Sequence, residues 1–139
     1  SMSAQKLGLL KELESNTFVR ILPSAIHGIG VFAIKPIPKA CRDFFSKEEG
    51  EWTELSFEEV ADLPESSRTL IETYCLFNET HYYVPSKGFK AMDLSLFLNH
   101  STEPNIKSVN DGLEFESLRA IEVGEELLID YGTIVTSDE

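Results

Sequence analysis

The sequence predicts an α+β domain in which short β-strands outnumber helices. Runs of apolar and β-branched residues, separated by turn residues, occupy both ends of the chain, and a helical segment interrupts them in the middle. This order of strands, helical insert and strands is typical of an α+β or mostly-β fold. With 139 residues, of which 42% are hydrophobic, the chain is long enough for one domain with a sizeable core.

The first elements follow from local patterning. Leucines at helical spacing in Ala4–Ser15 predict either a short N-terminal helix or a mobile arm. Phe18–Leu22 and Val31–Ile34 have the composition of strands, and Pro23–Gly30 joins them as a loop. We therefore expect a strand pair at the start of the domain.

The helical insert has a clear start signal. Ser56 with Glu59 three residues later forms a capping-box signature, in which each side chain satisfies a free backbone group of the first turn. Pro64 should end that helix. A second helix is predicted from about Glu65 to Leu76.

Short strand-like segments follow the insert. They are Tyr82–Val84, Ile106–Val109, Leu113–Ser117 and Glu126–Ile129. Asp111-Gly112 lies between two of them and is a strong signal for a hairpin turn. The strands on either side of this turn are therefore expected to pair.

Charge and cysteine content limit the classes of function. The chain carries 24 acidic and 12 basic residues, for a formal charge of −12, which disfavours binding to nucleic acid or anionic membranes and favours a basic partner. The charge is also consistent with a role in solubility alone. Cys41 and Cys75 suggest neither a disulfide framework nor a zinc cluster. Because no membrane span or secretory leader is present, we expect an intracellular protein, nuclear or cytoplasmic.

The first candidate motif runs from Ser24 to Ala33, and its His27-Gly28-Ile29-Gly30 part lies between the first two predicted strands. Two glycines that bracket one residue let the backbone turn tightly and approach a ligand closely. The pattern is not a dinucleotide fingerprint, because the third glycine is missing and a strand follows instead of a helix. Alone, such a loop is more often a plain turn.

The second motif, Asn99 to Asn105, follows an apolar Leu-Phe-Leu run. Asn99 and His100 can supply oriented hydrogen bonds to a ligand, or they can belong to a buried polar network that closes a turn before Pro104. The third motif runs from Leu118 to Gly132 and presents a tyrosine just past a strand end, where rigid scaffolds often place chemistry. The alternative for that tyrosine is an amphipathic residue at the rim of the core.

In this order and at this spacing, the three motifs resemble the SET-domain protein lysine methyltransferases over roughly residues 17–132. The most specific parts are Asn-His-Ser-x-x-Pro-Asn and Gly-Glu-Glu-Leu-x-x-x-Asp-Tyr-Gly. The resemblance implies small curved β-sheets, a helical insert at about 56–77, and a C-terminal pseudoknot between the Asn99 segment and the final strand. The implied division is an N-terminal arm or short helix at 1–16, the SET domain at 17–133 and a tail at 134–139.

The resemblance also implies an activity, the transfer of a methyl group from S-adenosylmethionine to a lysine of a basic peptide or histone-like tail, without a metal. The implied cofactor-binding residues are His27, Gly28, Ile29, Gly30, Asn99, His100 and Tyr131. Tyr131 would also be the active-site tyrosine. The implied substrate-channel residues are Tyr83, Phe97 and Ile129. Where relatives carry phenylalanine or tyrosine, Ile129 would leave room for higher methylation.

The sequence departs from the family in ways that bear on activity. Thr102 stands where many relatives have a zinc-binding cysteine, which joins a cysteine-rich tail that completes the lysine channel. Leu96 replaces a common arginine, and Pro38–Cys41 replaces a Gly-Glu turn. Either a partner, such as a second subunit in a homodimer, closes the site, or cofactor binding is weak.

Two other functions remain open from the sequence. One is a SET-like interaction module that has lost catalysis, which the missing tail favours. The other is an unrelated α+β binding domain, which requires all three motif matches to be accidental.

Overall fold

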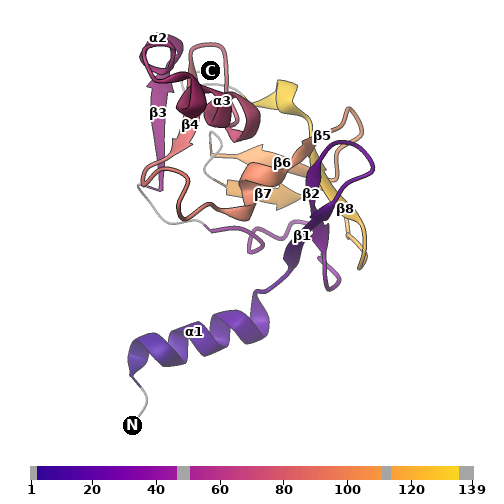
Figure 1. Ribbon diagram of the computed structural model, residues 1–139. Helices are drawn as coiled ribbons and strands as arrows, with labels where there is room; N and C mark the ends of the chain where they lie inside the picture. The colour runs from indigo at the N-terminus through magenta and orange to yellow at the C-terminus, as the bar shows by residue number, and fades with distance from the viewer. Residues whose placement is uncertain (1–2, 47–50, 111–113, 135–139) are drawn as a thin grey trace.

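The structure is a computed structural model that describes residues 3–46, 51–110 and 114–134. Within these ranges the strands form one four-stranded sheet and two strand pairs, with helices around them (Figure 1). The strands are β1 (Val19–Pro23), β2 (Ile29–Ala33), β3 (Trp52–Ser56), β4 (His81–Pro85), β5 (Asn99–His100), β6 (Ile106–Val109), β7 (Glu114–Ser117) and β8 (Glu126–Ile129). The helices are α1 (Ala4–Ser15), α2 (Phe57–Ala61) and α3 (Glu65–Tyr74), with short 3-10 helices η1 (Leu94–Phe97) and η2 (Tyr131–Thr133). The predicted α+β fold, in which strands predominate, is confirmed.

The four-stranded sheet brings together segments from the beginning, middle and end of the chain. Its strand order is β1-β2-β8-β5, so that a late strand lies between an early strand and a middle one. β8 pairs antiparallel with β2, where Val31 faces Leu127, and parallel with β5, where Asn99 faces Leu128. This arrangement places β8, which belongs to the third motif, between β2 of the first motif and β5 of the second.

The side chain of Asn105 closes the crossing between residues 99–105 and β8. Its Nδ2 donates to the carbonyl of Glu126 at 2.8 Å, and its Oδ1 accepts from the amide of Leu128 at 2.8 Å. The Asn105 amide itself donates to the Leu128 carbonyl at 3.1 Å. Asn105 is only 4% exposed, and its amide therefore substitutes for a peptide group that the sheet would otherwise lack.

Two apolar clusters support the site. The larger one is formed mainly by buried residues of the four-stranded sheet and the β6–β7 pair, and its fully buried members include Val31, Ile106 and Leu127. The smaller one lies within the helical insert, between α2, α3 and the β3–β4 pair. Phe97 packs against both clusters, so η1 joins the insert to the rest of the domain.

The local predictions for the insert and the late strands are largely confirmed. The capping box forms as expected, because Ser56 Oγ accepts from the Glu59 amide at 3.1 Å and Glu59 Oε1 accepts from the Ser56 amide at 2.9 Å. The strands β6 and β8 have the predicted bounds, and β6 pairs antiparallel with β7. The turn residues Asp111-Gly112 lie outside the described residues.

Two strands were not predicted. β3 has a mostly polar sequence without apolar alternation, and it forms because its backbone pairs antiparallel with β4 along its whole length. β5 has only two residues, and its hydrogen bonds come from β8. Both strands depend on distant partners that local sequence does not reveal.

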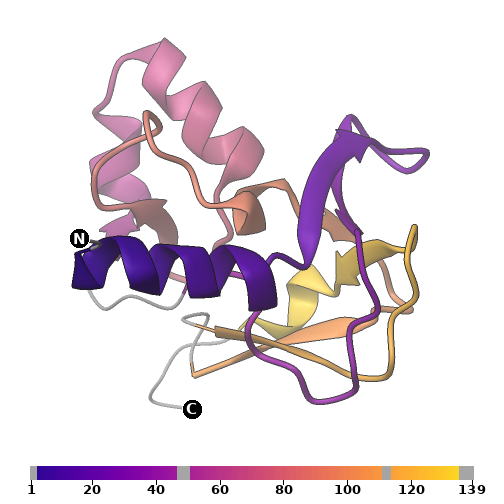
Figure 2. The same cartoon turned by 90° about the horizontal axis from the view of Figure 1, so that it is seen from below.

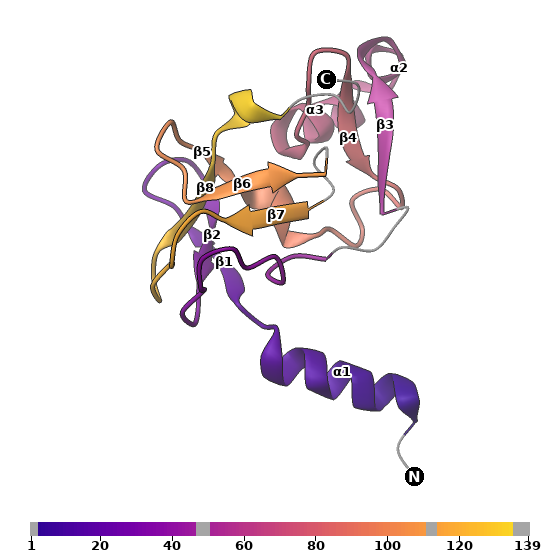
Figure 3. The same cartoon turned by 180° about the vertical axis from the view of Figure 1, so that it is seen from behind.

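The N-terminal segment is a helix, which was one of the two predicted alternatives, the other being a mobile arm. α1 begins at a Ser3 cap, whose side chain accepts from the Lys6 amide, and none of its residues is buried. It extends away from the strands (Figures 1 and 3). Of the helices in the described ranges, none is long and apolar enough to cross a membrane.

Candidate active site

A cavity of about 570 Å³ lies between the β1–β2 loop and the helical insert. Figures 1 and 2 show these two parts on opposite sides of the molecule. The cavity is lined by Ile26, His27, Gly28, Ile29, Thr73, Tyr74, Leu96, Phe97, Leu98, Asn99, His100 and Tyr131. Its volume lies in the range of small-molecule sites. The structure therefore brings residues of all three motifs together around one space.

The β1–β2 loop is a tight turn that Ser24 holds at its base. The Ser24 amide donates to the Gly28 carbonyl at 2.8 Å, and the Ile26 amide donates to Ser24 Oγ at 3.0 Å. Gly28 has a φ of +46°, a backbone conformation that favours glycine. A Cβ there would meet nothing within 4 Å, because Gly28 faces open space.

Asn99 anchors this loop to the four-stranded sheet. Its side chain is almost fully buried, and Nδ2 donates to the carbonyls of His27 at 3.0 Å and Ile29 at 3.2 Å. Nδ2 also donates to Glu126 Oε2 at 2.8 Å. Since these protein acceptors engage the amide nitrogen, a ligand would meet Asn99 through Oδ1, which can only accept a hydrogen bond.

Tyr131 begins η2, separated by one residue from the end of β8, and it lines the cavity. Its hydroxyl donates to the carbonyl of Leu98, so the lone pairs of the hydroxyl oxygen remain to accept another hydrogen bond. Burial raises the pKa of the Tyr131 hydroxyl above its ordinary value. The hydroxyl is therefore protonated at neutral pH.

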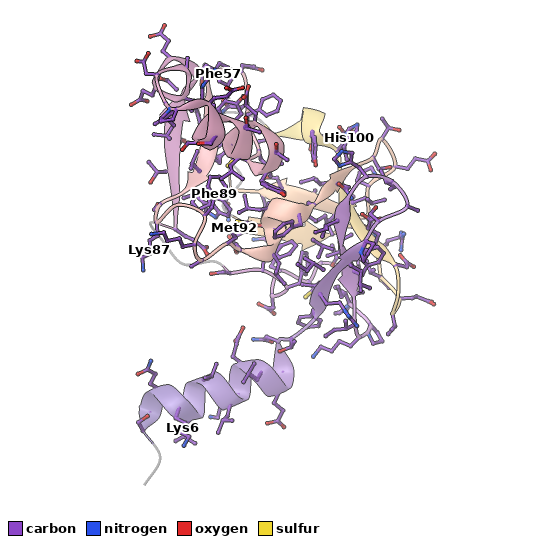
Figure 4. All side chains as sticks on the ribbon, in the orientation of Figure 1. Lys6, Phe57, Lys87, Phe89, Met92 and His100 are labelled. Atoms are coloured by element: carbon purple, nitrogen blue, oxygen red, sulfur yellow. The ribbon has the colours of Figure 1, made fainter. Side chains whose placement is uncertain are left out.

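His100 supports Tyr131 from the neighbouring strand. The Tyr131 amide donates to His100 Nδ1 at 3.0 Å, and the two ring centroids lie 5.1 Å apart. Because Nδ1 accepts this hydrogen bond, the neutral imidazole carries its proton on Nε2. Figure 4 shows His100 beside η2, on the side of the molecule that also carries Phe57 of the insert.

The remaining candidate residues lie in different surroundings. Phe97 lines the cavity and packs edge-on against Tyr74, with ring centroids 5.5 Å apart. Tyr83 is buried, accepts from Asn78 Nδ2 at 3.1 Å, and lines a separate cavity of about 10 Å³. Ile129 is fully buried in the larger apolar cluster. Tyr83 and Ile129 are thus not among the described residues that line the large cavity.

Sequence reasoning missed several residues of this region. Thr73 and Tyr74, at the end of α3, line the large cavity, and neither was among the predicted site residues. Ser24 and Glu126 hold the β1–β2 loop through their side chains. Both belong to motifs noted in the sequence, but no local signal indicates that they contact each other across 102 positions.

Comparisons with known proteins agree with the geometry. The family model of the SET domain matches residues 28–132. A histone-lysine N-methyltransferase of Schizosaccharomyces pombe, specific for lysine 37 of histone H3, is 32% identical over 117 residues, covering 76% of this chain and 67% of that protein.

Solved structures show the same fold at lower identity. A candidate histone methyltransferase of Plasmodium falciparum matches with a TM-score of 0.55 and 18% identity, covering 88% of this chain and 98% of the other. A chain of a humanized Chaetomium thermophilum Polycomb Repressive Complex 2 matches with a TM-score of 0.59 and 21% identity. That match covers 88% of this chain but only 16% of the other, so it concerns one domain of a much longer protein.

Proposed function

Since this chain belongs to the SET-domain family, we propose that it is a protein lysine N-methyltransferase that binds S-adenosylmethionine in the large cavity. The single observation that carries the proposal is the convergence of the β1–β2 loop, Asn99, His100 and Tyr131 on one space of suitable size. These are the residues that the family resemblance assigns to the cofactor.

The cavity residues fit the chemistry of this cofactor. An apolar part of the cavity wall suits an adenosine ring system. It is formed by Ile26, Ile29, Phe97 and Leu98. Asn99 Oδ1 is an acceptor that can meet a cationic amino group, because its own donors are engaged by the protein. When bound, S-adenosylmethionine supplies an activated methyl group on a positively charged sulfur.

The protein's own residues would prepare the lysine amine. A free lysine has a pKa of about 10.4 and must lose its proton before it can act as a nucleophile. An apolar and aromatic surrounding disfavours the ammonium form and lowers that pKa. The Tyr131 hydroxyl, which donates to Leu98, can accept from an amine N–H and orient its lone pair. Because its pKa is raised, Tyr131 positions the amine without removing the proton.

We propose that the substrate is a basic segment such as a histone tail, and that the protein therefore acts in the nucleus. The formal charge of −12 and the histone H3 specificity of the fission yeast relative support this choice. Phe97, Tyr83 and Ile129 remain proposals for the lysine channel. Of these, Phe97 lines the large cavity, whereas Tyr83 and Ile129 are buried residues that are not among its lining residues. A homodimer or another partner that completes the site also stays a proposal.

The test combines binding with methyl transfer. We expect titration calorimetry to detect S-adenosylmethionine binding, and mass spectrometry to detect methylated lysine after incubation with recombinant histone H3. Tyr131→Phe should retain cofactor affinity and reduce transfer at least tenfold, about the effect of one lost hydrogen bond to the reacting amine. Tyr82→Phe is the matched control, because Tyr82 packs against Phe57 and Phe77 away from the cavity.

The outcomes separate the enzyme from the alternative. Undiminished transfer by Tyr131→Phe would refute the role of that tyrosine. An absence of binding heat up to millimolar cofactor would refute the methyltransferase proposal and favour an interaction module.

A further inference from the structure

We propose that Glu126 is a positioning residue of the cofactor site, whose carboxylate holds the β1–β2 loop in its ligand-binding shape. The inference rests on the proposed function, since it concerns the same cavity. Glu126 does not line the cavity itself. It acts through Ser24 and Asn99, and its effect on a ligand is therefore indirect.

The carboxylate of Glu126 bridges both sides of the loop. Ser24 Oγ donates to it, with distances of 2.8 Å to Oε1 and 3.0 Å to Oε2. Asn99 Nδ2 donates to Oε2 at 2.8 Å. Hydrogen bonds to a charged acceptor are about twice as strong as bonds between neutral groups. A single side chain thus connects the base of the loop to the strand that faces it.

Ser24 and Asn99, which Glu126 holds in place, each form hydrogen bonds to the backbone of the β1–β2 loop. Because Ser24 donates its hydroxyl proton to Glu126, the Ser24 oxygen is turned to accept from the Ile26 amide at 3.0 Å. Because Asn99 is oriented by Glu126, its amide also reaches the carbonyls of His27 and Ile29. The orientation of these peptide groups, which border the cavity, therefore depends on one carboxylate.

Gly30 gives independent support for this role. A Cβ at Gly30 would lie 2.1 Å from Glu126 Oε2 and 2.8 Å from its Cδ, so an alanine there would have to displace the carboxylate from its position. Gly30 is not among the glycines with a positive φ, and it sits in β2 opposite Leu22. The second glycine of the loop motif is thus required by the space that the carboxylate occupies, and not by backbone strain.

The preceding residue provides a matched control. Glu125 is also acidic and lies just before β8, but its side chain pairs with Arg119 at 2.9 Å instead of with Ser24 or Asn99. Glu125→Gln therefore removes the same charge at the adjacent position without touching the loop.

The first test measures the loop in the free protein. Glu126→Gln removes the negative charge and replaces one acceptor oxygen by an NH₂ group, so Ser24 and Asn99 are left to share one neutral amide oxygen. We expect hydrogen exchange at the Ile26 amide to become at least about tenfold faster, since its acceptor Ser24 is held less firmly. Glu125→Gln should leave this exchange rate unchanged. An unchanged rate in Glu126→Gln would overturn the inference.

The second test measures affinity for S-adenosylhomocysteine, a stable analogue, by titration calorimetry. Glu126→Gln and Ser24→Ala should each weaken binding about tenfold, and Glu125→Gln should not. The double variant should bind no more weakly than the weaker single variant, because both changes break the same bridge. Additive losses would overturn the bridge as the cause.

The third test separates positioning from mere stability. Gly30→Ala should lower the melting temperature by several degrees in the wild-type background, but much less in the Glu126→Ala background, where the clashing carboxylate is absent. Affinity for S-adenosylhomocysteine should stay low in that double variant although its stability recovers. Recovery of affinity together with stability would show that Glu126 has only a structural role.

Failure of the proposed function has a different signature. If the wild-type protein binds neither S-adenosylmethionine nor its analogue, the proposed function fails, and hydrogen exchange in the free protein still decides whether Glu126 orders the loop.

Discussion

Asn105→Ala should be strongly destabilising, because it removes the side chain that substitutes for a peptide group beside β8. The change deletes two hydrogen bonds of 2.8 Å each, to the Glu126 carbonyl and from the Leu128 amide. Each buried backbone group left without a partner costs about 1–3 kcal/mol. The site is 4% exposed, so water reaches it poorly. We expect the free energy of unfolding to fall by about 3 kcal/mol, a large part of the stability of a small domain.

Urea unfolding, followed by tryptophan fluorescence and circular dichroism, would measure this change. Asn16→Ala is the matched control, since Asn16 caps the end of α1, outside the buried core, and its side chain donates to Glu12 of the same helix. The control should shift the unfolding free energy by less than about 0.5 kcal/mol. A loss below about 1 kcal/mol in Asn105→Ala would refute the account of the crossing, because it would mean that the backbone groups of β8 find other partners.

Three further outcomes follow from local chemistry. Ser56→Ala removes the capping box of α2 and should cost about 1 kcal/mol in urea unfolding, so an unchanged midpoint would contradict it. Burial raises the pKa of the Cys75 thiol to about 12, so Cys75 should react with thiol reagents at neutral pH only after Cys41, which mass spectrometry would show. Burial also raises the pKa of Asp93, so its charge lowers stability above that pKa and the cost disappears as the pH falls below about 4. Asp93→Asn, which keeps an acceptor for the η1 amide, should therefore stabilise the protein at pH 7 and lose this advantage at pH 3; equal effects at both values would contradict the assignment.

Much of the fold was accessible from local patterns. The capping box at Ser56, the break at Pro64 and the bounds of β6 and β8 were predicted, because helix caps and strand propensity depend on a few adjacent residues. α3 ends at Tyr74, two residues earlier than predicted, and helix ends are where local signals are weakest. The motif order also predicted the SET-domain fold, which the family match confirms.

Many residues of the candidate site could be predicted from the sequence, but the hydrogen bonds between them could not. The sequence identified Asn99 as a polar residue that either contacts a ligand or joins a buried network. In the structure its amide nitrogen serves the network, and only Oδ1 is left for a ligand. The distinction depends on where the β1–β2 loop and Glu126 lie, and those segments come from opposite ends of the chain.

The sequence by itself predicted the family, the positions of most helices and strands, and the candidate site residues. Each of these predictions depends on short motifs and local residue patterns. The tertiary structure decided that β8 runs between β2 and β5, that Glu126 meets Ser24 across 102 positions, and that Tyr131 rather than Ile129 faces the cavity. These contacts form only when distant segments are packed together, and the free energy that selects them comes from burial and hydrogen bonding across the whole domain. A local sequence pattern therefore cannot predict which distant residues will be in contact.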